Sequence, residues 1–405
     1  MAWHTRPFGC LNNTTSENAL FQNGRHLPVK IEVERDVLAE AVAWTARALP
    51  SRPAVPVLAG MRLQVDTELT LSSFDYDVSA RARVPVAVAE DGVALVSGRL
   101  LAEITRSLPA RPVDISSDGT RTTLTCGSAT FSLLTMPAED YPTLPDMPAP
   151  AGTIGSDSFA SAVGQSAAAA GRDDTLPALT GIRIEIAGDT LTLVSTDRYR
   201  LAVRELRWSP ARPDLAASVL VPARALADTA RALTAGAEVS IALALPGEEG
   251  AGGEGMIGFE GAGRQTTTRL LGGDFPRYQA LLPTHVNGVA ELAAGPFAEA
   301  VKRVALVAER NTAVRLSFSA GQLVLEAGTG DEAQAVEVLE AGYEGDDIQI
   351  AFNPQYLLDG LTAIDSDVAR IAFTEPGKPA LLTGKPAPDE QPDYRYLLMP
   401  IRLGG

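Results

Sequence analysis

The side chains best able to do chemistry gather in the stretch STDRYRLAVREL, residues 195–206. It holds one aspartate, three arginines and a tyrosine, and it directly follows the alternating apolar run DTLTLV. So much charge is unusual for the buried end of a β-strand. Four roles are open to it: a catalytic cluster, an anion clamp, a solvated strand edge, or a surface on which another protein docks.

The residues in and around this stretch do not form a known catalytic motif. A Ser/His/Asp triad requires a histidine, and none of the three in the chain lies in this stretch. Ser195 is not on a GxSxG elbow, and the chain has no P-loop or Rossmann fingerprint. No second carboxylate or histidine stands close to Asp197 in sequence, and Cys10 and Cys126 form no metal-binding cluster. We therefore predict a protein that is no enzyme and has no metal or cofactor.

The composition is that of an ordinary globular protein. With 405 residues the chain is too long for one core and is expected to form two to four domains. No apolar run approaches the roughly 20 residues that span a bilayer, and the N-terminus lacks the apolar core of a secretory signal. We therefore expect a cytoplasmic protein with free thiols and no membrane contact. The net charge of −16 argues at first against nucleic acid as a partner.

An internal repeat organises the chain. A helical pattern followed by alternating strands begins at Val33, Ser156 and Gly295, and each copy has a second half of the same kind, with helices expected from Arg99, Arg224 and Pro354. This predicts an α+β fold of three repeated domains, each built from two helix-plus-sheet units. Pro-rich segments at 141–153 and 275–288 place the boundaries. The expected domains are residues 29–149, 150–287 and 288–405, after an extension, residues 1–28, that we expect to be disordered.

Repeated units must bury their faces on neighbours, so an array ends in polar caps or closes on itself. The last residues, YLLMPIRLGG, are apolar almost to the end. We therefore expect closure into a ring, with a second chain, rather than an open solenoid.

The motifs STDRYRLAV (195–203), TMPAEDYPTLP (135–145), GDFPRYQALLP (273–283), FNPQYLLDGL (352–361) and YLLMPIRL (396–403) together resemble those of the beta sliding clamp of bacterial replicative DNA polymerase. The similarity runs from about Val29 to Leu403, and the segment GRDDTLPALTG resembles the corresponding segment of actinobacterial clamps. The resemblance implies a head-to-tail homodimer that forms a six-domain ring around double-stranded DNA, without sequence specificity or enzymatic activity. It also implies three kinds of protein partner: the alpha subunit of the replicative polymerase, the clamp loader, and other proteins with clamp-binding peptides.

For the charged stretch, the resemblance implies a pocket into which partner proteins insert a short peptide. Apolar residues would form its floor, while arginine and threonine at the rim would orient the peptide. Plain core packing of Met399 and Pro400 is compatible with this role. The pocket residues that the resemblance implies are Leu179, Thr196, Arg198, Tyr199, Arg200, Leu201, Pro276, Leu281, Pro379, Leu397, Met399, Pro400, Ile401 and Arg402.

The ring hypothesis reconciles an acidic protein with DNA, because a ring that threads a duplex needs only a modestly basic lining. Arg99 and Arg106 are seven residues apart, as are Arg224 and Arg231, so each pair shares one helix face. Solvated helix faces without a partner are the alternative. A scaffold protein that never meets DNA predicts no such arginine-lined helices. The residues expected to line the DNA are Arg52, Arg99, Arg106, Arg172, Arg224, Arg231, Lys302 and Arg303.

Three points stay open at this level. Many family members have Gly-His where this chain has Arg198 and Tyr199, and a basic residue in place of Ala280. The altered pocket leaves a second hypothesis: a second-copy clamp that confers resistance to a clamp-targeting inhibitor. Leu306 matches a dimer-interface position of the family, but its spacing fits the core of its own domain equally well.

Overall fold

The computed structural model describes residues 29–234, 236–247, 255–308, 312–328, 333–387 and 390–402. The extension expected at residues 1–28 lies outside these ranges. The chain divides into two compact units, each described here by itself. The first comprises the described residues up to Asp75 together with Arg81–Thr143, and the second comprises Tyr76–Ala80 and the described residues from Leu144 onward.

One order of elements occurs three times in the described part of the chain. It runs as one strand, a helix, five strands, a second helix and three strands. The copies are β1–β9 with α1 and α2, β10–β18 with α3 and α4, and β19–β27 with α5 and α6. The threefold α+β repeat read from the sequence is confirmed.

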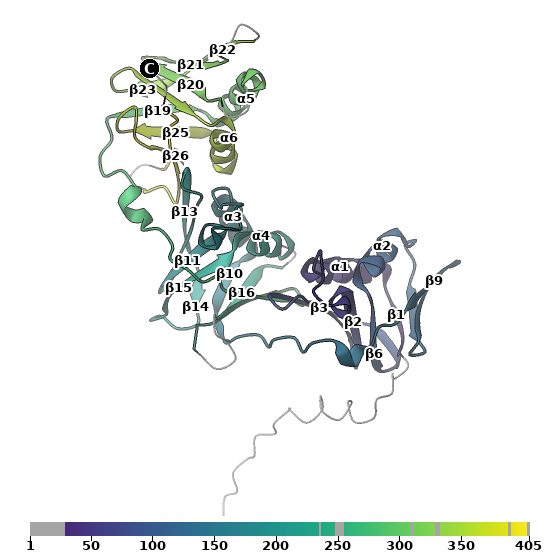
Figure 1. Cartoon of the computed structure of the whole chain (residues 1–405). Coiled ribbons are helices and arrows are strands. Elements are labelled where there is room, and N and C mark those ends of the chain that lie inside the picture. The colour runs from purple at the N-terminus through teal and green to yellow at the C-terminus, as the bar shows by residue number, and fades with distance from the viewer. Residues whose placement is uncertain are drawn as a thin grey trace, which may run out of the picture. The chain divides into compact units, whose positions relative to one another are not determined.

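The two helices of each copy pack side by side, as Figure 1 shows. Their inward faces carry the apolar residues that set the helical spacing in the sequence: Val42, Val163 and Val301 are each completely buried. A Phe159–Phe259 ring pair, with centroids 5.4 Å apart, joins α3 to a strand of its domain. The helices are α1 (Arg35–Thr45), α2 (Gly98–Ser107), α3 (Ser156–Ala167), α4 (Ala223–Ala232), α5 (Ala294–Val304) and α6 (Pro354–Ala363).

In the first unit, one five-stranded antiparallel sheet has the order β5-β1-β7-β8-β9, and β3, β2 and β6 pair in a second sheet. The strands of the first copy are β1 (Val29–Val33), β2 (Gly60–Val65), β3 (Leu69–Phe74), β4 (Val78–Val84), β5 (Ala87–Glu90), β6 (Gly92–Ser97), β7 (Val113–Ser117), β8 (Arg121–Cys126) and β9 (Ala129–Leu134). Cys126 is a buried free thiol.

In the second unit, the second copy begins with β10, which pairs with β14 and β16, and β16 pairs with β17 and β17 with β18. The strands are β10 (Pro150–Gly155), β11 (Gly181–Ala187), β12 (Thr190–Thr196), β13 (Arg200–Arg207), β14 (Ser209–Pro210), β15 (Ala216–Pro222), β16 (Glu238–Ala244), β17 (Met256–Gly261) and β18 (Arg264–Arg269).

The third copy contributes a four-stranded sheet, β22-β21-β20-β24, and half of a larger one. The strands are β19 (Gly288–Ala293), β20 (Val314–Ser319), β21 (Gln322–Ala327), β22 (Ala335–Glu340), β23 (Gly342–Glu344), β24 (Ile348–Phe352), β25 (Val368–Phe373), β26 (Ala380–Gly384) and β27 (Tyr394–Leu398).

The second and third copies share one antiparallel sheet of nine strands, with the order β15-β11-β12-β13-β27-β26-β25-β19-β23. The junction is the pairing of β13 with β27, in which Leu201 lies opposite Leu397. Continuous backbone hydrogen bonding therefore fixes the C-terminal strand against the charged stretch of the second copy.

No helix in the described ranges is long and apolar enough to cross a membrane.

Candidate functional site

Residues 195–206 form the end of β12, a tight turn and β13. The Asp197 carboxylate accepts hydrogen bonds from the backbone N–H groups of Tyr199 (3.0 Å) and Arg200 (3.1 Å). The Thr196 hydroxyl donates to the Arg200 carbonyl (2.7 Å) and accepts from the Arg198 N–H (3.2 Å). These short polar side chains supply the turn with local hydrogen bonds, as is typical of aspartate and threonine in loops.

The turn holds Arg198 at a φ of 78°, in the left-handed region. Tyr76, at the matching turn of the first copy, has a φ of 75°. A residue with a Cβ pays about 1–2 kcal/mol for this conformation. The geometry explains why glycine suits this position of the family motif.

Arg198→Gly is therefore expected to stabilise the protein by about 0.5–1 kcal/mol, because the relief of strain exceeds the entropy that glycine loses on folding. Arg198→Ala is the matched control, since it removes the guanidinium but keeps the Cβ. Urea unfolding followed by circular dichroism measures both. An equal gain in the two variants would show that removal of charge, not backbone strain, is responsible.

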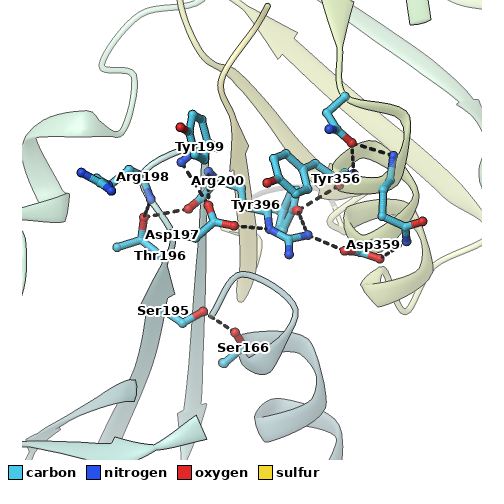
Figure 2. Close-up of polar contacts among 12 residues, drawn as sticks. Ser166, Ser195, Thr196, Asp197, Arg198, Tyr199, Arg200, Tyr356, Asp359 and Tyr396 are labelled. Atoms are coloured by element: carbon cyan, nitrogen blue, oxygen red, sulfur yellow. Dashed lines mark hydrogen bonds and ion pairs between the residues drawn. The ribbon is translucent and has the colours of Figure 1, made fainter. Parts of the chain in front are cut away.

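Arg200 connects the turn to the third domain. Its side chain is only 6% exposed, and its Nε bonds the Asp197 carboxylate at 3.0 Å. Its Nη1 bonds Asp359 on α6 and the Tyr396 hydroxyl on β27, the latter at 3.3 Å (Figure 2). The guanidinium carbon lies 4.3 Å from the ring centroid of Tyr356, within cation–π range. One buried cation thus ties together three elements from two domains.

The protonation states in this cluster do not favour acid–base chemistry. Burial raises the pKa of the Tyr356 and Tyr396 hydroxyls, and both stay neutral at physiological pH. Burial by itself would lower the pKa of Arg200, but Tyr396 and the hydrogen bond to Asp359 raise it above its usual value. The arginine and the tyrosines therefore titrate far from neutral pH, where a general acid or base is most effective. Among the described residues, no cluster of three or more His, Cys, Asp or Glu could hold a metal ion.

A cavity of about 570 Å³ lies beside this network. It is bounded by the segment after α3, by the β12–β13 turn and by α6. The rings of Tyr199 and Tyr356 stack, with centroids 6.2 Å apart and planes inclined by 26°. The structure brings together in its lining five residues that the sequence singled out: Leu179, Arg198, Tyr199, Arg200 and Arg172.

Thr196 and Leu201, from the expected pocket, are buried behind this lining and support it. Leu201 and Leu397 pack in one apolar cluster with Val194, Val203 and Tyr278. Arg200 likewise differs from the expected rim residue, because its hydrogen bonds point into the protein. Thr196 and Leu201 therefore do not line the cavity. Arg200 lines it, but its hydrogen bonds go to Asp197, Asp359 and Tyr396.

The remaining expected residues are 399–402 of the C-terminal segment, together with Pro276, Leu281 and Pro379. The Met399 N–H donates to the Tyr199 carbonyl (2.9 Å), so this segment begins at the cavity wall, and the Ile401 N–H donates to the Ala351 carbonyl (2.8 Å). Leu281, Met399 and Ile401 are 50%, 43% and 37% exposed. Pro276, Pro379 and Pro400 are half-buried and Arg402 is exposed. None of these residues lines the cavity itself.

Sequence reasoning missed Tyr356 and Asp359, which complete the site from α6. The signal lay in the motif FNPQYLLDGL, in which these two residues are three apart and so share one helix face. Pro354 at the first helical position, and Asn353, whose side chain caps the N–H groups of Gln355 (2.9 Å) and Tyr356 (3.2 Å), begin this helix.

All eight basic residues expected to line the DNA are exposed. The side chains of Arg106 on α2 and Arg224 on α4 form no hydrogen bond or ion pair with the described residues. Arg231 pairs with Asp228 at 2.7 Å and Lys302 with Glu299 at 2.7 Å, both within one helix. Arg303 bonds both carboxylate oxygens of Glu337 on β22. Exposed pairs of this kind are weak, so these side chains remain available to an anionic partner.

Leu306 is 84% exposed, on the short 3₁₀ turn Ala305–Val307 that follows α5. It does not belong to the core of its own domain, which was one of the two positions that its spacing allowed.

The chain contains three copies of one α+β domain, and a cavity lies between the second and third copies, beside the ion-paired Arg200. These features are those of a binding protein built from repeats. Models of the N-terminal, central and C-terminal domains of the DNA polymerase III beta subunit match residues 29–145, 153–277 and 279–402. A beta sliding clamp of Streptomyces coelicolor is 62% identical over 380 residues, which cover 93% of this chain and all of that protein. The beta sliding clamp homolog GriR of Streptomyces muensis is 44% identical over 378 residues, with the same coverage.

Solved structures agree. A sliding clamp of Pseudomonas aeruginosa bound to griselimycin has a TM-score of 0.83 at 28% identity, and the match covers 93% of this chain and 100% of that one. The chain belongs to the DNA polymerase III beta subunit family, the beta sliding clamps of bacteria. Like the family, it is a non-catalytic processivity factor of DNA replication that binds DNA and polymerase.

Proposed function

We propose that the cavity of the second unit, with the apolar surface beside it, binds short peptide segments of partner proteins. The partners are the alpha subunit of the replicative polymerase, the clamp loader, and other proteins that carry a similar segment. The observation that carries this proposal is the meeting of Leu179, Arg198 and Tyr199 with α6 around one cavity, next to the C-terminal segment.

The chemistry of this surface suits a peptide. Leu281, Met399 and Ile401 offer exposed apolar side chains that apolar residues of a peptide could contact. The stacked tyrosines add a flat apolar wall, and aromatic residues are frequent at the energetic centre of interfaces. A short peptide held in this way would bind with about micromolar affinity, near −8 kcal/mol, and would exchange readily.

Met399→Asp is expected to weaken peptide binding at least about tenfold, because a carboxylate would replace an apolar contact. The probe is a set of short, overlapping, fluorescein-labelled peptides that covers the polymerase alpha subunit, measured by anisotropy. Val37→Asp, on α1, is the matched control, because Val37 and Met399 are both 43% exposed. Equal affinity of the two variants for every binding peptide would remove Met399 from the site.

We further propose that two copies of the chain associate head to tail into a six-domain ring around the duplex. Two edge strands support this. β9 ends the five-stranded sheet of the first unit and exposes Leu134 (68%). β22 ends the four-stranded sheet of the second unit and exposes Val336 (64%) and Val338 (56%). Open edges with apolar side chains are liable to pair with another chain, and β22 of one protomer would continue the sheet that ends at β9 of its partner.

The double variant Leu306→Lys/Val338→Lys is expected to be monomeric in analytical ultracentrifugation, because it places two charges in this seam. It should also lose retention on nicked circular DNA. Val88→Lys, on the edge strand β5, is the control, since Val88 is 37% exposed and lies outside the proposed seam. A double variant that stays dimeric would place the seam elsewhere.

Arg172, expected from the sequence to line the DNA, lies instead in the cavity lining. The other seven basic residues are proposed to face the duplex inside the ring: Arg52, Arg99, Arg106, Arg224, Arg231, Lys302 and Arg303. Because topology rather than tight contact holds a ring on DNA, retention should be brief and salt-sensitive on linear DNA and lasting on circular DNA. We also propose that the domain boundaries lie at 149/150 and 287/288 and that the protein is cytoplasmic. The identity of 62% to a beta sliding clamp, against 44% to GriR, favours the general replication role over a second-copy resistance role.

A further inference from the structure

The side chains of two arginines on different segments of the cavity lining form no hydrogen bond or ion pair with the described residues. Arg172 follows α3, and Arg198 is in the β12–β13 turn; both are exposed and both line the cavity. The charge of Arg198 reaches the segment of Arg172, because it adds to the hydrogen bonds from Thr175 that lower the pKa of Asp173. Two uncommitted guanidinium groups therefore share this space.

The carboxylates of the lining are already engaged. Asp197 and Asp359 both bond Arg200. Asp197 also accepts two backbone N–H groups, and Asp359 accepts the Gln355 amide at 2.8 Å. Asp173 accepts the hydroxyl of Thr175 at 2.6 Å. Among the charged side chains that line the cavity, those of Arg172 and Arg198 are the ones without a hydrogen-bond partner in the described part of the chain, and an anion is the strongest acceptor for them.

We propose that this cavity selects peptides that place a carboxylate between Arg172 and Arg198, and that Arg198 is the specificity-determining residue. The inference rests on the proposed peptide-binding function. A peptide fits better than a nucleic acid because the lining also includes Leu176, Leu179 and the Tyr199–Tyr356 pair, which apolar side chains of a peptide can contact. A glycine at position 198 could make no such contact, so the preference for an acidic peptide is a property of the arginine in this chain.

The expected effect is moderate and depends on salt. A carboxylate that meets two partly exposed guanidinium groups should bind about three- to fivefold more tightly than its neutral amide analogue. The advantage should shrink as ionic strength rises, because solvent screens these charges.

The test compares Glu with Gln in otherwise identical ligands. The probes are fluorescein-labelled hexapeptides of Leu, Phe and Ala, with Glu or Gln at one position at a time, titrated by anisotropy into the full-length protein. We expect one position at which Glu is preferred about three- to fivefold by the unaltered protein. In Arg198→Gly and Arg198→Gln this ratio should fall toward one, in Arg198→Lys it should largely persist, and in Arg212→Gln, a charge-matched control at an exposed arginine between β14 and β15, it should not change.

The outcomes separate the inference from the function on which it rests. If hexapeptides bind but Glu and Gln are equivalent at every position, or if the Glu preference survives Arg198→Gln, the charge selection is wrong and the peptide site stands. If no hexapeptide binds, the peptide site fails and the inference with it. If short oligothymidylate displaces bound peptide and Arg198→Gln abolishes that displacement, the two arginines serve DNA instead, which also overturns the proposal.

Discussion

Asp359→Ala is expected to destabilise the second unit by about 2–3 kcal/mol. Removal of one partner of a buried ion pair typically costs about 3–5 kcal/mol, because the other charge is left without compensation. The Arg200 side chain is 6% exposed and loses one of its two carboxylate partners. Asp359 itself is 27% exposed, so water already weakens this ion pair. We therefore expect a loss of stability toward or below the lower end of the range of about 3–5 kcal/mol.

The measurement is urea unfolding, combined with hydrogen exchange of the α6 amides, since these should lose protection first. Asp365→Ala is the matched control: Asp365 is exposed, lies just beyond α6, and has no ion pair among the described residues. The double variant Arg200→Met/Asp359→Leu should recover part of the stability, because apolar residues of similar size can replace a buried pair at little cost. An Asp359→Ala protein as stable as Asp365→Ala would show that the pair contributes nothing.

Gly360→Ala is expected to destabilise the protein by about 1–3 kcal/mol, although alanine is the better helix former. A Cβ at position 360 would lie 2.6 Å from two ring atoms of Tyr396 and 3.0 Å from a methyl group of Leu382. Tyr396 is completely buried and hydrogen-bonds Arg200 and the Tyr356 carbonyl (2.9 Å), so its ring has no space to move. The added methyl group would push α6 away from β27.

Gly164→Ala, in the middle of α3, is the matched control with the opposite expected sign. No heavy atom lies within 4 Å of a Cβ at position 164, so the substitution should stabilise the protein by about 1 kcal/mol through helix propensity alone. Urea unfolding of both variants measures the two effects. A stabilising Gly360→Ala would mean that α6 and β27 can separate without cost, and that their contact does not define the pocket wall.

The sequence did not predict two local features, the backbone conformation of Arg198 and the exposure of Leu306. The left-handed turn at Arg198 could not be read from its residue type, because arginine has no preference for positive φ. Hydrogen bonds that the Asp197 and Thr196 side chains accept from backbone N–H groups hold this turn. Leu306 fitted two environments by spacing alone. It became exposed because the regular helix ends at Val304 and a 3₁₀ turn rotates the next residues outward.

The sequence by itself determined the architecture of each copy, because helical and period-two spacing of apolar residues depends only on neighbours along the chain. It also indicated that residues 195–206 do no catalysis, and their resemblance to the family motifs predicted a partner site there. Only the tertiary structure decided which residues complete that site. Asp359 is 159 positions from Arg200 in sequence, and it reaches Arg200 because β13 pairs with β27 and places α6 against the turn. Contacts between such distant residues follow from sheet pairing, so no local pattern could predict them.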